Sequence, residues 1–260
     1  SIILDQSSTF SSTVAFVASS SGTLAGVTIN DSDAFELATL TVTGDLTVTA
    51  GGEITDGGTV TVGGDLAATT DAGNSAINLG TLAVDGSIAL NTHGSGAATV
   101  VNDAGLDFAA STVGGALSAT ATSQGITDSG VLAITGTLTL TVDDGQSITL
   151  DQSSTFGTVA FVASSGTIAS VEIKDSNAFD LAALTVTGNL TVTAGGAVTD
   201  TGALAIAGVT TISASSQNVT LDTETNNFAG EVRITGAVVT VVDEDAIVLG
   251  ASTVSGTYGI

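Results

Sequence analysis

Residues 184–208 read LTVTGNLTVTAGGAVTDTGALAIAG, and this stretch decides the fold. Its apolar residues come in pairs with one small or polar residue between them, as at Leu184 and Val186 or at Leu190 and Val192. A period of two is typical of strands with one buried face. Each short run ends in Gly, Asn, Asp or Ser, which tolerate the turn conformations that a corner requires. No stretch has a 3.6-residue period, so helical crossovers are not expected.

The same runs recur along the chain with a long and a short period. Residues 2–64 return almost verbatim at 148–208. A shorter repeat lies inside the long one, because Asp56, Asp128 and Asp200 stand in the same motif at equal steps of about 72 residues. The 72-residue unit is therefore the building block of the chain.

Short strands, tight corners and a long-range repeat predict an all-β fold, a right-handed parallel β-helix (β-solenoid). Aligned runs start at Val159, Leu184, Leu204 and Val232, with an average spacing of about 24 residues. We therefore expect about three coils in each unit. Residues 1–260 would form one continuous solenoid segment of about three and a half units, without caps. About eleven coils stacked at about 4.8 Å give a rod of roughly 50 Å.

The charge of the chain excludes several kinds of partner. Twenty-six Asp and Glu residues stand against two basic residues, Lys174 and Arg233, and the formal net charge is −24. Nucleic acids and anionic membranes bind to clustered Lys and Arg, so neither is an expected partner. The apolar residues never form the run of roughly 18 that a membrane helix needs, so direct membrane insertion is not expected.

Cysteine and proline are both absent from the chain. A disulfide framework and a Cys-based metal or redox site are therefore excluded. The same absences suit a chain that crosses a secretion pore unfolded, because no premature disulfide and no slow proline isomerisation would delay folding on the far side. We expect an extracellular or cell-surface location.

Three phrases in the chain carry a family resemblance: LTVTAGGAVTDTGALAIAG (190–208), NVTLDTETNNFAGEVRITG (218–236) and AIVLGASTVSG (246–256). They resemble the repeats of large bacterial surface proteins of the filamentous-haemagglutinin type, which are exported by two-partner secretion or as autotransporter passengers. The resemblance covers essentially the whole chain, and its motifs specify coils and corners. It implies a right-handed β-helix stalk outside a bacterial cell that serves adhesion, biofilm or a fibrous coat.

The periodic aspartates Asp56, Asp128 and Asp200 have two interpretations. A ladder of carboxylates would suit a row of cations. A tight corner favours the same residues, because the Asp side chain can bond to its own backbone and a following Gly can take a positive φ. We favour the structural corner.

Acidic clusters make weakly bound calcium the one cofactor that the sequence suggests. Calcium needs about six to eight oxygen ligands, and no segment matches an EF-hand or the nonapeptide of calcium-binding β-rolls. Solvated corners are therefore the favoured interpretation. The candidate calcium ligands are Asp31, Asp33, Asp243, Glu244 and Asp245.

Phenylalanines recur at matching points of the units, and we expect them to stack on successive coils as a ladder inside the core. A sugar-binding platform would favour Trp or Tyr, of which the chain has only one Tyr. The expected core ladder comprises Phe10, Phe35, Phe108, Phe156, Phe179 and Phe228.

Threonines alternate with apolar residues, as at Thr47 and Thr49 and again at Thr191 and Thr193. Flat threonine arrays on solenoids can bind ice, which makes an ice-binding solenoid one alternative function. Such a surface needs the motif on every coil, whereas the sequence confines it to part of each unit.

The favoured function is mechanical and not enzymatic: a rod segment that gives reach, display, adhesion or fibre assembly. A catalytic histidine needs a nucleophile and an orienting partner, but the only histidine, His93, lies in a Gly- and Ser-rich stretch typical of a loop. A β-helix that binds or cleaves polysaccharides is the other alternative, although cleavage of an acidic polymer would need a basic cluster. The expected partners are neighbouring solenoid segments, end to end in the same chain or in other copies, and a host, cell-surface or glycan receptor.

Overall fold

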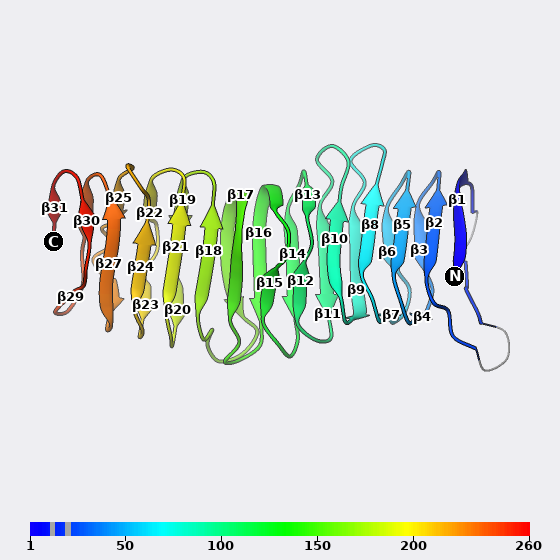
Figure 1. Ribbon diagram of the computed structural model, residues 1–260, viewed down its shortest axis with the longest axis horizontal. Helices are drawn as coiled ribbons and strands as arrows, with labels where there is room; N and C mark the ends of the chain where they lie inside the picture. The colour runs from blue at the N-terminus through cyan, green and yellow to red at the C-terminus, as the bar shows by residue number, and fades with distance from the viewer. Residues whose placement is uncertain (11–13, 19–21) are drawn as a thin grey trace.

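The computed structural model describes residues 1–10, 14–18 and 22–260. Across these residues the fold is all-β without a helix, and parallel strands stack as a β-solenoid of about twelve coils. Figure 1 shows one rod, with the N-terminus at one end and the C-terminus at the other. At about 4.8 Å per coil, the rod is roughly 55 Å long. The predicted parallel β-solenoid is confirmed.

Each coil has one side made of a long strand and one side made of two short strands. Side one begins as the stack of long strands β2 (Val27–Asp31), β5 (Leu46–Ala50) and β8 (Leu66–Thr70). Side two begins as two stacks of short strands. In the first stack β3 (Phe35–Leu37) pairs with β6 (Ile54–Asp56) of the next coil. In the second stack β4 (Leu40–Val42) pairs with β7 (Val60–Val62).

The long strand changes sides once in every unit. β9 (Ile77–Val84) continues side two, and the next long strand, β11 (Ala98–Asn102), stacks on it. The short strands β12 (Leu106–Phe108) and β13 (Ser111–Val113) stack on the long strand β10 (Ser87–Asn91) of side one. From β11 to the end of the second unit, therefore, the long strands lie on side two.

An additional long strand causes this exchange. A unit contains three coils of one long and two short strands, followed by one more long strand that fills only half a coil. β10 is this additional strand in the first unit, and its counterparts are the end of β17 (Ile148–Ala163) and β27 (Glu231–Gly236). The next unit therefore starts half a turn later. β18 (Val171–Asp175) returns the long strand to side one, stacked on the start of β17.

A 72-residue unit thus spans three and a half coils and not three, and the coils between β2 and β27 contain about 21 residues each. The spacing in the sequence indicated longer coils because it mixed two kinds of strand. The runs at Val159 and Val232 lie in additional strands, whereas those at Leu184 and Leu204 start short strands of side two. Two units make seven coils and restore the original side, which matches the near-identical return of residues 2–64 at 148–208.

The remaining strands follow the same scheme. They are β1 (Ile2–Ser8), β14 (Leu117–Ala121), β15 (Ile126–Asp128), β16 (Leu132–Val142), β19 (Phe179–Leu181), β20 (Leu184–Val186), β21 (Leu190–Ala194), β22 (Val198–Asp200), β23 (Leu204–Ile206), β24 (Thr210–Ser213), β25 (Val219–Leu221), β26 (Asn227–Phe228), β28 (Val239–Val241), β29 (Val248–Leu249), β30 (Thr253–Val254) and β31 (Tyr258–Gly259).

Alternation along each strand builds a continuous apolar core. In β5 the side chain of Leu46 is fully buried, whereas that of Thr47 faces outward. Parallel register places Leu46 between Val27 of the preceding coil and Leu66 of the next. Burying a side chain of this kind stabilises the fold by about 1.5–3 kcal/mol. Because every coil repeats this stacking, its stability depends mainly on its two neighbours.

Side chains at the corners carry hydrogen bonds from one coil to the next. Asp45 Oδ1 accepts from the backbone N–H of Asp65 at 3.0 Å, and Asp65 Oδ1 accepts from that of Ser87 at 2.8 Å. The N–H and hydroxyl of Ser87 together hold the pKa of Asp65 below its usual value. In the equivalent corner two units later, Asn189 Oδ1 accepts from the Val209 N–H at 2.9 Å. These bonds satisfy backbone donors where the strands end.

Candidate functional site

The three periodic aspartates bond to the following coil and not to their own turn. The carboxylates of Asp56 and Asp200 accept from the N–H groups of Gly80 and Asp222, both at 2.9 Å. Asp128 Oδ1 accepts from the next coil in the same way, at 2.8 Å from the Asp151 N–H. The prediction that each Asp side chain bonds to its own backbone is therefore wrong, because the partners lie 22 to 24 residues further along the chain.

Asp128 and Asp200 differ at their second carboxylate oxygen. Asn226 Nδ2 donates to Asp200 Oδ2 at 2.6 Å, whereas Asp128 Oδ2 is buried without a partner. Burial raises the pKa of Asp128 to about 6, against the N–H bonds from Asp151 and Gln152, which lower it. Asp128 is therefore a carboxyl that titrates close to neutral pH.

The candidate calcium ligands do not gather into a cation site. Glu244 accepts from Asn227 Nδ2 at 2.7 Å, and Asp243 Oδ1 accepts from the Phe228 N–H at 3.2 Å. The backbone N–H of Asp33 donates to Asp31 Oδ1 at 3.2 Å, so these two residues also form a local corner. Within residues 1–10, 14–18 and 22–260, no group of three or more His, Cys, Asp or Glu side chains could hold a metal ion.

One polar position at the end of a long strand recurs in every unit, and two of its members, Asp31 and Asp243, are among the candidate calcium ligands. Asp31, Asn102 and Asp175 each end the first long strand of a unit, and each is at most 2% exposed. Asp243 is the counterpart in the last unit. The sequence contains a signal for this position, because TVVN at 99–102 and TVVD at 240–243 align Asn102 with Asp243.

The six phenylalanines pack in or against the core but do not form the expected continuous ladder. Five of the six side chains are at most 4% exposed, and Phe10 is partly buried against the core. The register partners are aliphatic in most cases; Phe179 pairs with Val198 and Phe228 with Ile206. Phe10 and Phe35 meet edge to face, with ring centroids 6.1 Å apart. The exchange of sides places equivalent phenylalanines on different stacks, which prevents a single ladder.

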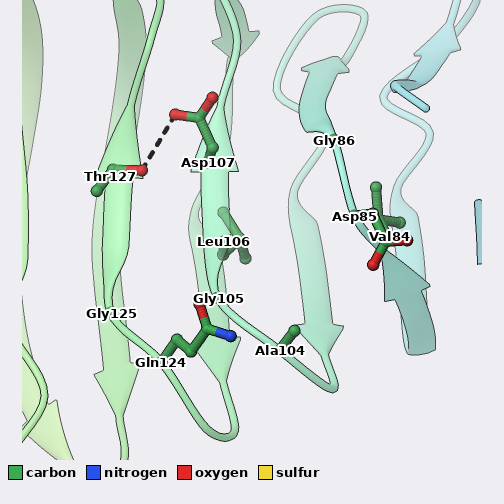
Figure 2. Close-up of a pocket in the computed structure, with 10 residues that line it drawn as sticks. All are labelled: Val84, Asp85, Gly86, Ala104, Gly105, Leu106, Asp107, Gln124, Gly125 and Thr127. Atoms are coloured by element: carbon green, nitrogen blue, oxygen red, sulfur yellow. Dashed lines mark hydrogen bonds between the residues drawn. The ribbon is translucent and has the colours of Figure 1, made fainter. Parts of the chain in front are cut away.

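A hollow of about 320 Å³ opens where the long strand first changes sides (Figure 2). Its polar lining is Asp85, Asp107, Gln124 and Thr127, and Thr127 Oγ1 donates to Asp107 Oδ1 at 3.2 Å. These groups would accept hydrogen bonds from a hydroxyl-bearing ligand. Gly125 forms part of the wall, where an added Cβ would lie 2.4 Å from the carbonyl oxygen of Ser147.

The hollow at the second exchange has a different lining. It measures about 260 Å³, and Phe156, Gly157 and Asn177 are among its lining residues. Gly157 and Phe156 bring no carboxylate, so the acidic groups of the first hollow are not repeated. The polar lining of the first hollow is therefore particular to the first exchange.

Threonine stacks on the outer surface are short. Thr191 of β21 lies beside Thr211 of β24, but Glu172 and Arg233 occupy the coils on either side of this pair. Arg233 bonds to Glu231 at 2.7 Å and holds the pKa of that carboxyl below its usual value. The charged neighbours interrupt the flat threonine array that ice binding would require.

The single histidine lies in an exposed turn. His93 Nδ1 is 2.7 Å from the carbonyl oxygen of Gly73 in the preceding coil, and its backbone N–H donates to Thr70 Oγ1 at 3.1 Å. These contacts hold one loop against another. In the part of the chain that the structure describes, no helix is long and apolar enough to cross a membrane.

A family model describes this repeat. It is a family of repeats of unknown function (DUF5649), and it matches residues 24–85, 95–163 and 168–235. The chain belongs to this family. The three matches begin at positions 24, 95 and 168, in agreement with the 72-residue unit. A search of curated proteins and a search of solved structures each found no match.

Proposed function

We propose that this chain is a length of structural or adhesive rod from a secreted or cell-surface bacterial protein of the filamentous-haemagglutinin type. The observation that carries the proposal is the continuity of the hydrogen-bonded stack through the changes of side. Register pairs run from Ile2 with Val27 at one end to Thr240 with Gly259 at the other. A DUF5649 chain of this kind can lengthen by whole units without a new type of contact.

The distribution of charge supports an extended rod outside the cell. Carboxylates such as Asp45 and Asp65 lie at corners, whereas the outer faces of strands such as β5 and β16 carry uncharged threonines. A net charge of −24 makes neighbouring rods repel one another at low salt. Salt screens such repulsion between exposed charges, so lateral association should increase with ionic strength. Neighbouring solenoid segments would continue the stack end to end.

Small-angle scattering of a lengthened chain tests the rod. Duplication of residues 46–189 adds two units, and the two joined ends are equivalent corners. We expect the particle to lengthen by seven coils, about 34 Å at about 4.8 Å per coil, with an unchanged cross-section. A second compact body joined by a linker would contradict the rod.

Attachment assays test the adhesive part of the proposal. Beads coated with the folded chain should attach to host cells or to glycan surfaces more strongly than beads coated with the same chain after unfolding. Equal attachment of the two preparations would remove adhesion and leave only the role of a spacer.

A further inference from the structure

Asn102 shows what the recurrent buried position requires. Its Oδ1 accepts from the Val84 N–H at 2.9 Å, and its Nδ2 donates to the Val84 carbonyl at 3.0 Å. Nδ2 also donates to the Gly105 carbonyl at 2.6 Å. One atom of this side chain therefore faces a backbone donor, and the other faces two backbone acceptors.

Asp175 occupies the same position one unit later. Its carboxyl accepts from the Phe156 N–H of the preceding coil, as Asn102 accepts from Val84, and its Oδ1 accepts from the Asn177 N–H at 3.0 Å. The other oxygen, Oδ2, is buried and has no hydrogen-bond partner. Asp31 follows the same arrangement, with Oδ1 3.4 Å from the Phe10 nitrogen and Oδ2 buried without a partner.

We propose that Asp175 is protonated in the folded rod and donates its one O–H from Oδ2 to a backbone carbonyl oxygen, where Asn102 donates from Nδ2. By equivalence with Asn102, the acceptor is the carbonyl oxygen of Phe156 or that of Ala178. The protonated carboxyl and the amide have nearly the same shape and the same order of acceptor and donor. An ionised carboxylate would instead turn a second acceptor toward backbone acceptors in a buried site.

The surroundings of Asp175 supply no positive charge. Its register partners, Ser154 on β17 and Ala194 on β21, are uncharged. Lys174 and Glu172 alternate with it along β18 and face outward. Burial raises the pKa of Asp175 and outweighs the N–H bonds that would lower it.

Acidic side chains on the neighbouring strands β17 and β19 face outward. Asp151 of β17 is exposed, and Asp180 of β19 accepts from the hydroxyls of Thr199 and Thr201, both at 2.6 Å. These carboxylates could only add negative charge, so they cannot neutralise an ionised carboxylate at Asp175. A proton on Oδ2 removes the buried negative charge and gives this oxygen a hydrogen bond to donate.

The consequence is a rod whose stability depends on pH. Because the pKa of Asp175 is raised in the folded state, its stabilisation is fully present below the unfolded value of about 4. The stabilisation is lost as the pH rises through the folded pKa. The coil that carries Asp175 therefore becomes easier to open at higher pH, whereas Asn102 at the same position adds no such dependence to its own coil. This inference concerns the fold and does not depend on the proposed function.

Reciprocal substitutions test the proposal through urea midpoints at pH 4.5 and pH 8. Asp175→Asn should leave the midpoint nearly unchanged at pH 4.5 and raise it at pH 8. Asn102→Asp should do the opposite, with little effect at pH 4.5 and a lower midpoint at pH 8. Asp103→Asn, at an exposed corner, controls for the change in net charge.

Three outcomes would overturn the proposal. Asp175→Asn would lower the midpoint equally at both pH values if a carboxylate were needed. Asp103→Asn would raise the midpoint at pH 8 as much as Asp175→Asn does if only net charge mattered. Added calcium chloride would raise the midpoint of the unmodified chain at pH 8, but not that of Asp175→Asn, if a cation were the occupant.

Discussion

Asn226 donates from Nδ2 to Asp200 Oδ2 at 2.6 Å, and this one bond separates two otherwise equivalent carboxylates. Ser154 stands at the same position one unit earlier, beside Asp128. Its side chain is too short to supply the second donor, and Asp128 Oδ2 stays without a partner. Both side chains also accept a backbone hydrogen bond from the preceding coil. Ser154 Oγ accepts from the Leu132 N–H and Asn226 Oδ1 from the Leu204 N–H, both at 2.9 Å.

Ser154→Asn should therefore lower the pKa of Asp128 from its value of about 6 and stabilise the fold at pH 7. The new amide would donate to Asp128 Oδ2 and would still accept the hydrogen bond from the Leu132 N–H. Carboxyl chemical shifts followed by NMR through a pH titration measure the pKa. An unchanged pKa of Asp128 would show that the Asn226 arrangement cannot be transferred.

The reverse change, Asn226→Ser, is the matched control. It should leave Asp200 Oδ2 without its donor and destabilise the fold by about 1–3 kcal/mol, the usual cost of leaving a buried polar group unsatisfied. Urea unfolding measures this difference.

Asp128 should also make stability depend on pH in a defined window. Its pKa is raised in the folded state, so its stabilisation is present below about pH 4 and is lost as the pH rises through about 6. Asp128→Asn should flatten the decline of the urea midpoint over this window. The idea fails if the unmodified chain and the variant show the same decline.

Core and surface substitutions on one strand should differ sharply. Leu138 of β16 is fully buried between Leu117 and Val159, and Leu138→Ala should destabilise the fold by about 2–5 kcal/mol. Thr139 faces outward, and Thr139→Ala should change stability by no more than about 0.5 kcal/mol. Similar losses from both variants would contradict the assignment of inward and outward faces.

Glycines should be required only where two coils approach closely. Gly125→Ala would place a Cβ 2.4 Å from the Ser147 carbonyl oxygen and should cost about 1–3 kcal/mol. An added Cβ at Gly80 meets no atom within 4 Å, so Gly80→Ala should be neutral or stabilise by up to about 1 kcal/mol. Thermal unfolding of both variants checks the contrast, and a loss at Gly80 as large as that at Gly125 would refute it.

The sequence predicted the strands and the repeat because both are local or periodic properties. Leu190 and Val192 alternate with threonine, and the structure buries both. The number of coils per unit was not predictable in this way. The additional strand β10 has the same alternation as other long strands, and only its stacking partners show that half a coil has been added.

The candidate site was less predictable for a related reason. The motif around Asp56 suggested a local turn, but stacking chooses its partner Gly80, in the next coil. The buried role of Asp175 depends on the Phe156 N–H, which belongs to the preceding coil. Contacts across coils can be predicted only when the length of each coil is known, and the sequence pattern indicated coils that were too long.

The most direct test of the three-and-a-half-coil unit is disulfide formation between introduced cysteines, because the chain has none of its own. Asn78 of β9 and Thr99 of β11 are register partners across the first change of sides, and adjacent strands suit the Cα separation that a disulfide needs. The pair Asn78→Cys and Thr99→Cys should form a disulfide under mild oxidation. A disulfide in the alternative pair Ala89→Cys and Thr99→Cys, with none between positions 78 and 99, would place the long strands on one side throughout and contradict the account.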